Sequence, residues 1–261
     1  MFQKLFTIPI YLTVLATGGA GLVYQVTWQK YLSRLLGSDS MATAVILGTF
    51  LGGLSFGYYL CGKITARDIN HFKAYALLEG AIGAWCLFFP IGFQMVEAIT
   101  RYWSFSPPAM IIFQGMLCSI LLMGIPTICM GGTIPFLTRG MSADISSETN
   151  IHAKVYAINT AGAFFGALLA GFYLIPEFGL PLTVMYTALV NLGACIFFYV
   201  IALNEKSKPY LKRTDSSPVN TGFDPSKTAS LGFPPMVLYL IALSSGFYVM
   251  TLENVLIRLR A

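Results

Sequence analysis

The sequence predicts an all-α protein: a polytopic integral membrane helix bundle. Two observations support this fold class. Of the 261 residues, 56% are hydrophobic and only 10% are charged, and the mean hydropathy is +0.70. Long apolar stretches also recur along the chain, separated by short polar loops. A water-soluble domain of this composition would expose too much apolar surface. A protein that spans a bilayer needs such a composition, because the hydrocarbon core does not solvate charges.

Seven segments reach the length of about 20 apolar residues that a helix needs to cross a bilayer. They are Phe6–Val26, Met41–Gly62, Phe72–Val96, Met110–Leu137, Val155–Pro176, Leu180–Leu203 and Met236–Leu252. They leave no room for a soluble catalytic domain of ordinary size. The first segment also resembles a secretory signal peptide, with Lys4 before an apolar run. An uncleaved helix is favoured because the apolar pattern continues to Val26.

The distribution of Lys and Arg predicts the orientation. With the N-terminus in the cytoplasm, eleven of the sixteen cationic residues fall on the inner side. The five on the outer side are Lys30, Arg34, Arg101, Arg258 and Arg260. The positive-inside rule therefore predicts a multi-pass protein of the cell (inner) membrane with a cytoplasmic N-terminus. The net charge of +5 reports orientation, and no nucleic-acid partner is expected.

Small residues spaced four apart predict close helix packing in the second and fifth segments. Such spacing forms a flat stripe that another backbone can approach. The helix-packing candidates are Gly48, Gly52, Gly53, Gly57, Gly162, Gly166 and Gly171. Because the fifth segment is the densest in Gly and Ala, we expect it to be tightly packed and central.

The third segment carries Glu79 one to two turns inside its inner end. A charged side chain within a membrane costs about 2.5–3.5 kcal/mol on insertion scales, so Glu79 is a candidate ligand-binding residue. A cation or proton site there would use Gln25, Gln114 and Asn159 as neutral partners. The alternative is a structural hydrogen bond to a neighbouring helix, or a carboxylate that reaches the inner surface. For Asn159, an interhelical hydrogen bond is the favoured role.

The remaining polar features are weaker signals. The sequence GGTIP at 131–135 either exposes backbone carbonyls to a cavity or simply kinks the fourth helix. His71 and His152 are interpreted as solvated residues at inner helix ends. The five cysteines lie in apolar runs without CxxC pairs, so no disulfide, metal site or cofactor is predicted.

The chain divides into three parts. Residues 1–203 form a six-helix transmembrane repeat, 204–235 a polar cytoplasmic linker, and 236–261 a seventh helix. At a constant offset of 228 residues, Ser245-Gly246 matches Thr17-Gly18, and Glu253 falls opposite Gln25. The seventh helix is therefore expected to open a second repeat, and Glu253 to belong to a pseudo-symmetric site. The sequence stops in mid-repeat, as a shortened product or a fragment would.

An ordered set of short motifs resembles the membrane domain of the fused major-facilitator-like and spermidine synthase (polyamine aminopropyltransferase) family. These motifs are GGAGLVYQVTW at 18–28, LSFG at 54–57, GKITAR at 62–67, LEGAIG at 78–83, MGGTIP at 130–135 and YAINTAG at 156–162. The resemblance implies a bundle of six-helix repeats, often followed by a cytosolic aminopropyltransferase domain. The sequence departs from that pattern because it carries no aminopropyltransferase motifs, and it has Ala66 where major-facilitator transporters usually carry Asp.

Two functions remain open from the sequence. The first is a non-catalytic membrane module, set in the lipid bilayer, that handles a small cationic ligand such as a polyamine. The second is an accessory subunit that docks on a larger membrane complex. A membrane-protein partner or a homo-oligomer is expected in either case.

Overall fold

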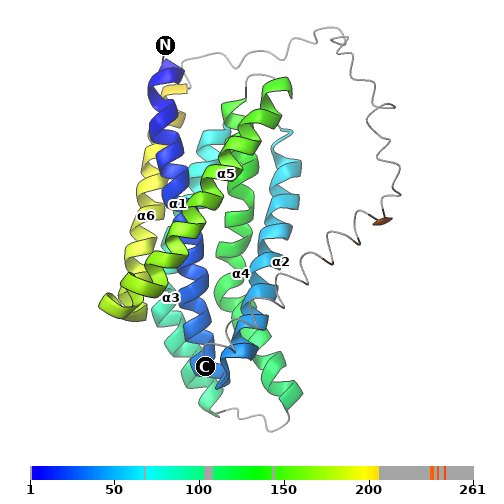
Figure 1. The fold of residues 1–261 in the computed structure, drawn as a ribbon, viewed down its shortest axis with the longest axis vertical. Helices are drawn as coiled ribbons and strands as arrows, with labels where there is room; N and C mark the ends of the chain where they lie inside the picture. The colour runs from blue at the N-terminus through cyan, green and yellow to red at the C-terminus, as the bar shows by residue number, and fades with distance from the viewer. Residues whose placement is uncertain are drawn as a thin grey trace. The chain divides into compact units, whose positions relative to one another are not determined.

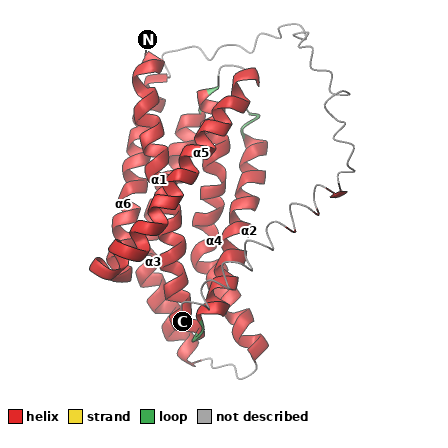
Figure 2. Cartoon of the chain, in the orientation of Figure 1, coloured by secondary structure: helices red, strands yellow, loops and turns green. Residues whose placement is uncertain are grey.

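The computed structural model describes residues 2–67, 69–102, 108–142 and 145–205, together with Met236, Val237, Leu240 and Ser244. Figure 2 shows that these residues are helical apart from short turns, with no strand among them. The chain forms two compact units, Met1–Asn204 and Glu205–Ala261. The predicted linker apart from Asn204 and Glu205, almost all of the seventh helix, and Glu253 lie outside the described residues.

The first unit is an up-and-down bundle of long helices (Figure 1). Its elements are α1 (Phe2–Leu36), α2 (Asp39–Ile64), α3 (His71–Tyr102), α4 (Pro108–Met141), α5 (Ile145–Leu169), the π-helix η1 (Ala170–Leu174) and α6 (Ile175–Glu205). The predicted all-α class is confirmed for the described residues. The helices extend beyond the predicted apolar segments because their amphipathic ends continue the same backbone hydrogen bonding.

Five segments are long and apolar enough to cross a membrane. Four correspond to α1, α2, α3 and α4, and the fifth runs through Glu148–Asn204 without a break. This last segment has 57 residues, whereas one span needs about 20. Figure 1 shows that α5 and α6 run in opposite directions, and the non-helical Gly179, at φ 72°, lies at the bend.

The structure does not support the finer expectation of a six-helix repeat followed by a second repeat. Length and composition give five candidate spans. The described residues contain no second copy of the bundle against which a repeat could be recognised. Of the two interpretations of 131–135, a break that exposes backbone carbonyls is not seen, because α4 continues as helix through Pro126 and Pro135. The alternative, a kink in the fourth helix, stays a prediction.

The connection between α1 and α2 is a tight turn, and its residues explain it. Gly37 adopts φ 66°, a conformation that costs a glycine little. Ser38 follows as the N-cap of α2, and its hydroxyl accepts the Met41 backbone N–H at 3.4 Å. The turn sets α2 antiparallel to α1.

The core lies along α1 rather than α5. Trp28 is fully buried and packs against Tyr24 and Phe89, with ring centroids 5.3 and 5.5 Å apart. By contrast, α5 leaves large apolar side chains such as Phe164 and Phe165 more than half exposed. The prediction that α5 is central is therefore wrong. Its small residues serve one close contact with α1, and its remaining surface is open.

The two histidines also differ from their interpretation as solvated residues. His71 is only 4% exposed, and its Nε2 lies 3.0 Å from the Thr65 carbonyl oxygen. The Nδ1 of His152 lies 3.3 Å from the Thr138 hydroxyl. Both rings take part in contacts that join neighbouring segments at the helix ends, which the sequence pattern did not reveal.

Candidate functional site: a buried polar network

Glu79 is the most unusual side chain in the bundle. It is 1% exposed, although it lies on a long apolar helix. Its Oε2 accepts a hydrogen bond of 2.7 Å from the Nδ2 of Asn191 on α6. Burying a carboxyl group without a hydrogen-bond donor would be strongly unfavourable. The contact with Asn191 therefore stabilises Glu79 in its buried position.

Residues from α1 and α3 complete the network. The Tyr24 hydroxyl donates to Asn191 Oδ1 at 2.8 Å, so Asn191 connects Tyr24 to Glu79. The hydroxyl of Tyr75, one turn before Glu79 on α3, also interacts with the carboxyl group. That hydroxyl also lies 3.2 Å from Thr17 Oγ1. Three helices therefore contribute polar groups to one network: Asn191 and Tyr75 contact the carboxyl group, and Tyr24 and Thr17 of α1 contact those two residues.

Glycines beside Glu79 explain why α6 comes so close. A side chain at Gly80 would meet the Sγ of Cys195 at 2.9 Å, and one at Gly83 would meet the Ala188 carbonyl oxygen at 3.0 Å. Because both positions lack side chains, α6 packs directly on α3. This contact brings Asn191 within hydrogen-bonding distance of Glu79.

The described partners of Glu79 are neutral. Two ion pairs of the described residues, Glu97–Arg101 and Arg139–Glu148, lie near helix ends and away from Glu79. Lys73, the cation nearest to Glu79 along α3, is exposed. The network therefore contains one acidic group, an amide and hydroxyls, an arrangement that can hold a single positive charge or a proton.

The neutral partners predicted from the sequence are not the ones found. Gln25 is half-buried and adjoins Tyr24 in the chain, but it lies on another face of α1. Gln114 lies near the start of α4, roughly 25 Å along the helix axis from Glu79 at 1.5 Å per residue. Asn159 packs against Gly18, at the contact between α5 and α1.

The glycines predicted to mediate packing fall into two groups. A side chain at Gly53 or Gly57 would clash with α4, and one at Gly162 or Gly166 would clash with α1. A side chain at Gly48, Gly52 or Gly171 would meet no described atom within 4 Å.

The sequence contains a signal on α6 that points to Asn191. Thr183, Thr187 and Asn191 are spaced four apart, and all three are buried, at no more than 5% exposure. Polar residues at this period lie on one face of a helix. A buried polar face on α6 would have pointed to Asn191 as a partner for a carboxyl group elsewhere in the bundle.

These observations define a class: an α-helical protein whose helices could cross a membrane and whose described core contains one carboxyl group, that of Glu79, hydrogen-bonded by a neutral amide. Comparison with curated proteins then gives weak similarity to polyamine aminopropyltransferases. The protein of that name from Leptospira interrogans is 24% identical over 213 residues. That of Mycobacterium tuberculosis strain H37Rv is 25% identical over 189 residues, and polyamine aminopropyltransferase 1 of Streptomyces coelicolor is 23% identical over 204 residues.

The matches cover 69–81% of this chain but only 33–39% of the relatives. The chain thus spans little more than a third of their length. No family model matches the sequence, and no solved structure gives a significant match. The similarity is compatible with a membrane module of this family.

Proposed function

We propose that this chain is the non-catalytic membrane module of a polyamine aminopropyltransferase-type protein and that Glu79 binds a small organic cation. The observation that carries the proposal is the carboxyl group of Glu79, which is the one acidic group in the core of the described residues and has neutral partners. A primary ammonium group would supply the missing positive charge, and the relatives' name directs attention to polyamines. We assign no bond-making step to these helices.

The buried state of Glu79 sets a condition on this function. Since the side chain is 1% exposed, a polyamine reaches it only when helices separate. The direct contact between α3 and α6 is the one that must open, because it covers the carboxyl group with Asn191. The module therefore alternates between a closed state, in which Asn191 is hydrogen-bonded to Glu79, and an open state that admits the cation.

The experiment is equilibrium binding of radiolabelled spermidine to the purified chain in detergent. We expect Glu79→Gln to weaken binding at least about ten-fold, which corresponds to about 1.4 kcal/mol. Glu97→Gln is the matched control, because Glu97 lies on the same helix but is ion-paired near its end. Equal affinity of the wild type and Glu79→Gln would remove Glu79 from the proposal.

The second candidate function is docking on a larger membrane assembly or on a second copy. It is favoured by the exposed glycines of α2, because Gly48 and Gly52 lie four apart with no described atom near the position of a side chain. Such a surface suits another helix in lipid. If Gly52→Leu abolishes a larger species in native mass spectrometry while Gly171→Leu does not, docking through α2 is supported.

The proposed topology is a multi-pass protein of the inner membrane with a cytoplasmic N-terminus, in which six helices form one repeat and residues 236–261 begin another. The excess of Lys and Arg on the inner side supports this orientation. Cysteine labelling from each side of intact cells tests it. Labelling of residues 206–227 from the exterior would overturn it.

A further inference from the structure

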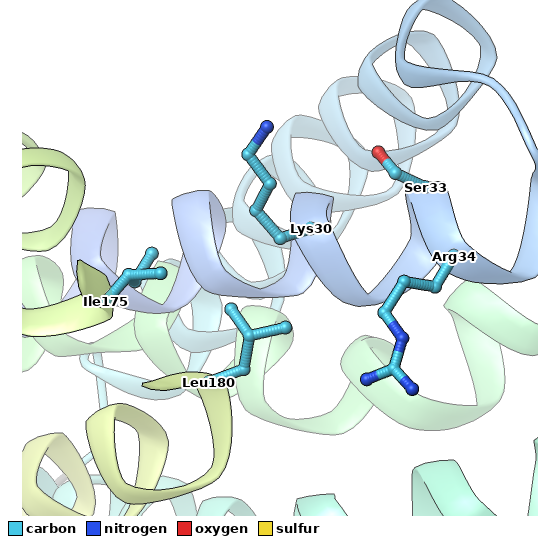
Figure 3. A pocket seen from close by; sticks show the side chains of 5 residues that line it. All are labelled: Lys30, Ser33, Arg34, Ile175 and Leu180. Atoms are coloured by element: carbon cyan, nitrogen blue, oxygen red, sulfur yellow. The ribbon is translucent and has the colours of Figure 1, made fainter. Parts of the chain in front are cut away.

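The pocket in Figure 3 does not suit an organic cation. It has a volume of about 390 Å³ and lies near the C-terminal end of α1. Figure 3 shows Lys30, Ser33 and Arg34 along α1, with Ile175 and Leu180 beside them. The residues that line this pocket thus include two basic ones and no acidic one. A carboxylate for a cation is offered instead by the buried polar network of the bundle.

The Tyr24 hydroxyl of this network has partners on two helices. On α6, it donates to Asn191 Oδ1 at 2.8 Å. On α3, it contacts the thiol of Cys86. Tyr24 and Cys86 are both fully buried. When α6 moves away and takes Asn191 with it, the contact with Cys86 keeps the Tyr24 hydroxyl beside α3.

The Tyr75 hydroxyl also stays in place without α6. Tyr75 is only 2% exposed and lies on α3 itself, one turn before Glu79. Its hydroxyl contacts the Glu79 carboxyl group and lies 3.2 Å from Thr17 Oγ1 on α1. Neither contact involves α6. The open state therefore presents one carboxyl group and two phenolic hydroxyls, all held by α1 and α3.

The place that Asn191 leaves sets the chemistry of the ligand. In the closed state, its amide lies between two groups, with Nδ2 2.7 Å from Glu79 Oε2 and Oδ1 2.8 Å from the Tyr24 hydroxyl. A ligand in that place must donate to the carboxylate in the way that Nδ2 does. The Tyr24 hydroxyl can direct its own proton to the Cys86 thiol and accept a hydrogen bond from the ligand, because a hydroxyl both donates and accepts.

We propose that the Glu79 site selects primary ammonium groups, which donate to the Glu79 carboxylate and to the hydroxyl oxygens of Tyr24 and Tyr75. This inference rests on the proposed function and adds two tyrosines to the ligand-binding residues. A primary ammonium has three N–H donors, one for each of these groups. A quaternary ammonium has the same charge but no N–H, so it would leave buried polar groups without hydrogen bonds.

The experiment is competition with radiolabelled spermidine for the purified chain in detergent. The competitors are n-butylamine and butyltrimethylammonium, which have the same charge and the same alkyl chain. A hydrogen bond to a charged group changes affinity about ten-fold or more. We therefore expect the wild type to prefer n-butylamine by about a hundred-fold, from two hydroxyl acceptors, and Tyr24→Phe to prefer it by about ten-fold.

The ratio of the two affinities separates ligand binding from a structural role of Tyr24. The population of the open state affects both affinities equally, so it cancels in the ratio. If Tyr24 only supports the closed state, Tyr24→Phe changes both affinities and leaves the ratio unchanged, which would overturn the proposal. Tyr31→Phe is the matched control, because it removes another buried hydroxyl of α1 that has no partner among the described residues. It should keep the wild-type ratio, and an equal fall in both variants would also overturn the proposal.

Failure of this inference is distinguishable from failure of the proposed function. Equal affinity of the wild type for the two competitors would overturn the selectivity, even where Glu79→Gln weakens spermidine binding. Failure of the proposed function instead appears as a spermidine affinity that Glu79→Gln does not change. Tyr75→Phe keeps the test decisive if Tyr24→Phe does not fold, because it should also lower the ratio about ten-fold. An unchanged ratio in Tyr75→Phe would count against the proposal.

Discussion

A covalent lock between α3 and α6 provides the most direct test of whether Glu79 functions by helix separation. The Cβ of a residue placed at Gly80 would lie 3.6 Å from the Cβ of Cys195 and 2.9 Å from its Sγ. Disulfide-bonded cysteines have Cβ atoms about 3.5–4.5 Å apart. We therefore expect Gly80→Cys to form a disulfide with the native Cys195 under mild oxidation.

The lock should act on both stability and binding. The bond closes a loop of 115 residues, for which the chain-entropy model gives about 4–5 kcal/mol of stabilisation before strain. Because a cation reaches Glu79 only in the open state, the apparent affinity scales with the population of that state. The oxidised variant should therefore bind no measurable spermidine, and reduction should restore binding.

The assay compares spermidine binding with and without dithiothreitol, with the bond verified by intact mass. Gly48→Cys is the matched control, because a side chain there would meet no described atom within 4 Å. If the bond forms and binding persists, separation of α3 from α6 is not required. If no bond forms, the packing of Gly80 against Cys195 is refuted.

Three further outcomes are expected for thermal unfolding in detergent, followed by helical circular dichroism. Tyr24→Phe should destabilise the protein by about 1–2 kcal/mol, because it leaves Asn191 Oδ1 without its donor. Tyr31→Phe should not destabilise it, since the buried Tyr31 hydroxyl has no partner among the described residues. Equal losses in the two variants would contradict the network. Gly57→Ala should destabilise by about 1–3 kcal/mol through its clash with the α4 backbone, whereas Gly52→Ala should be neutral or stabilising by up to about 1 kcal/mol. Asn191→Leu should cost at least as much as Tyr24→Phe, because it leaves the buried Tyr24 hydroxyl without its acceptor and removes one donor from Glu79; a neutral result would remove Asn191 from the site.

The sequence was sufficient to predict the helical class and to single out Glu79. Both follow from composition, because a long apolar segment tolerates a carboxyl group only where a partner supplies hydrogen bonds. The identity of that partner depends on which helices pack together and at what rotation. Asn191 lies 112 residues away in the chain, and no local pattern relates it to Glu79.

The glycines show the same limit. The spacing of four predicts two stripes on α2, one with Gly48 and Gly52 and one with Gly53 and Gly57. The sequence alone does not say which stripe packs against another helix. Only the face with Gly53 and Gly57 meets α4. A spacing of four residues shows that a helix has a face of small residues. It does not show which neighbouring helix packs on that face.

Gly80 and Gly83 lie close to Glu79 on α3, so the packing of α6 on α3 also determines the environment of the Glu79 carboxyl group. The two glycines bring α6 close enough for Asn191 to satisfy the carboxyl group, and the same approach removes that group from water. Stabilising the closed contact therefore weakens any cation binding at Glu79, since Asn191 and the ligand compete for one carboxyl group. A substitution that loosens α3 from α6 should lower stability while raising apparent affinity, and a purely structural Glu79 would lose stability with no gain in binding.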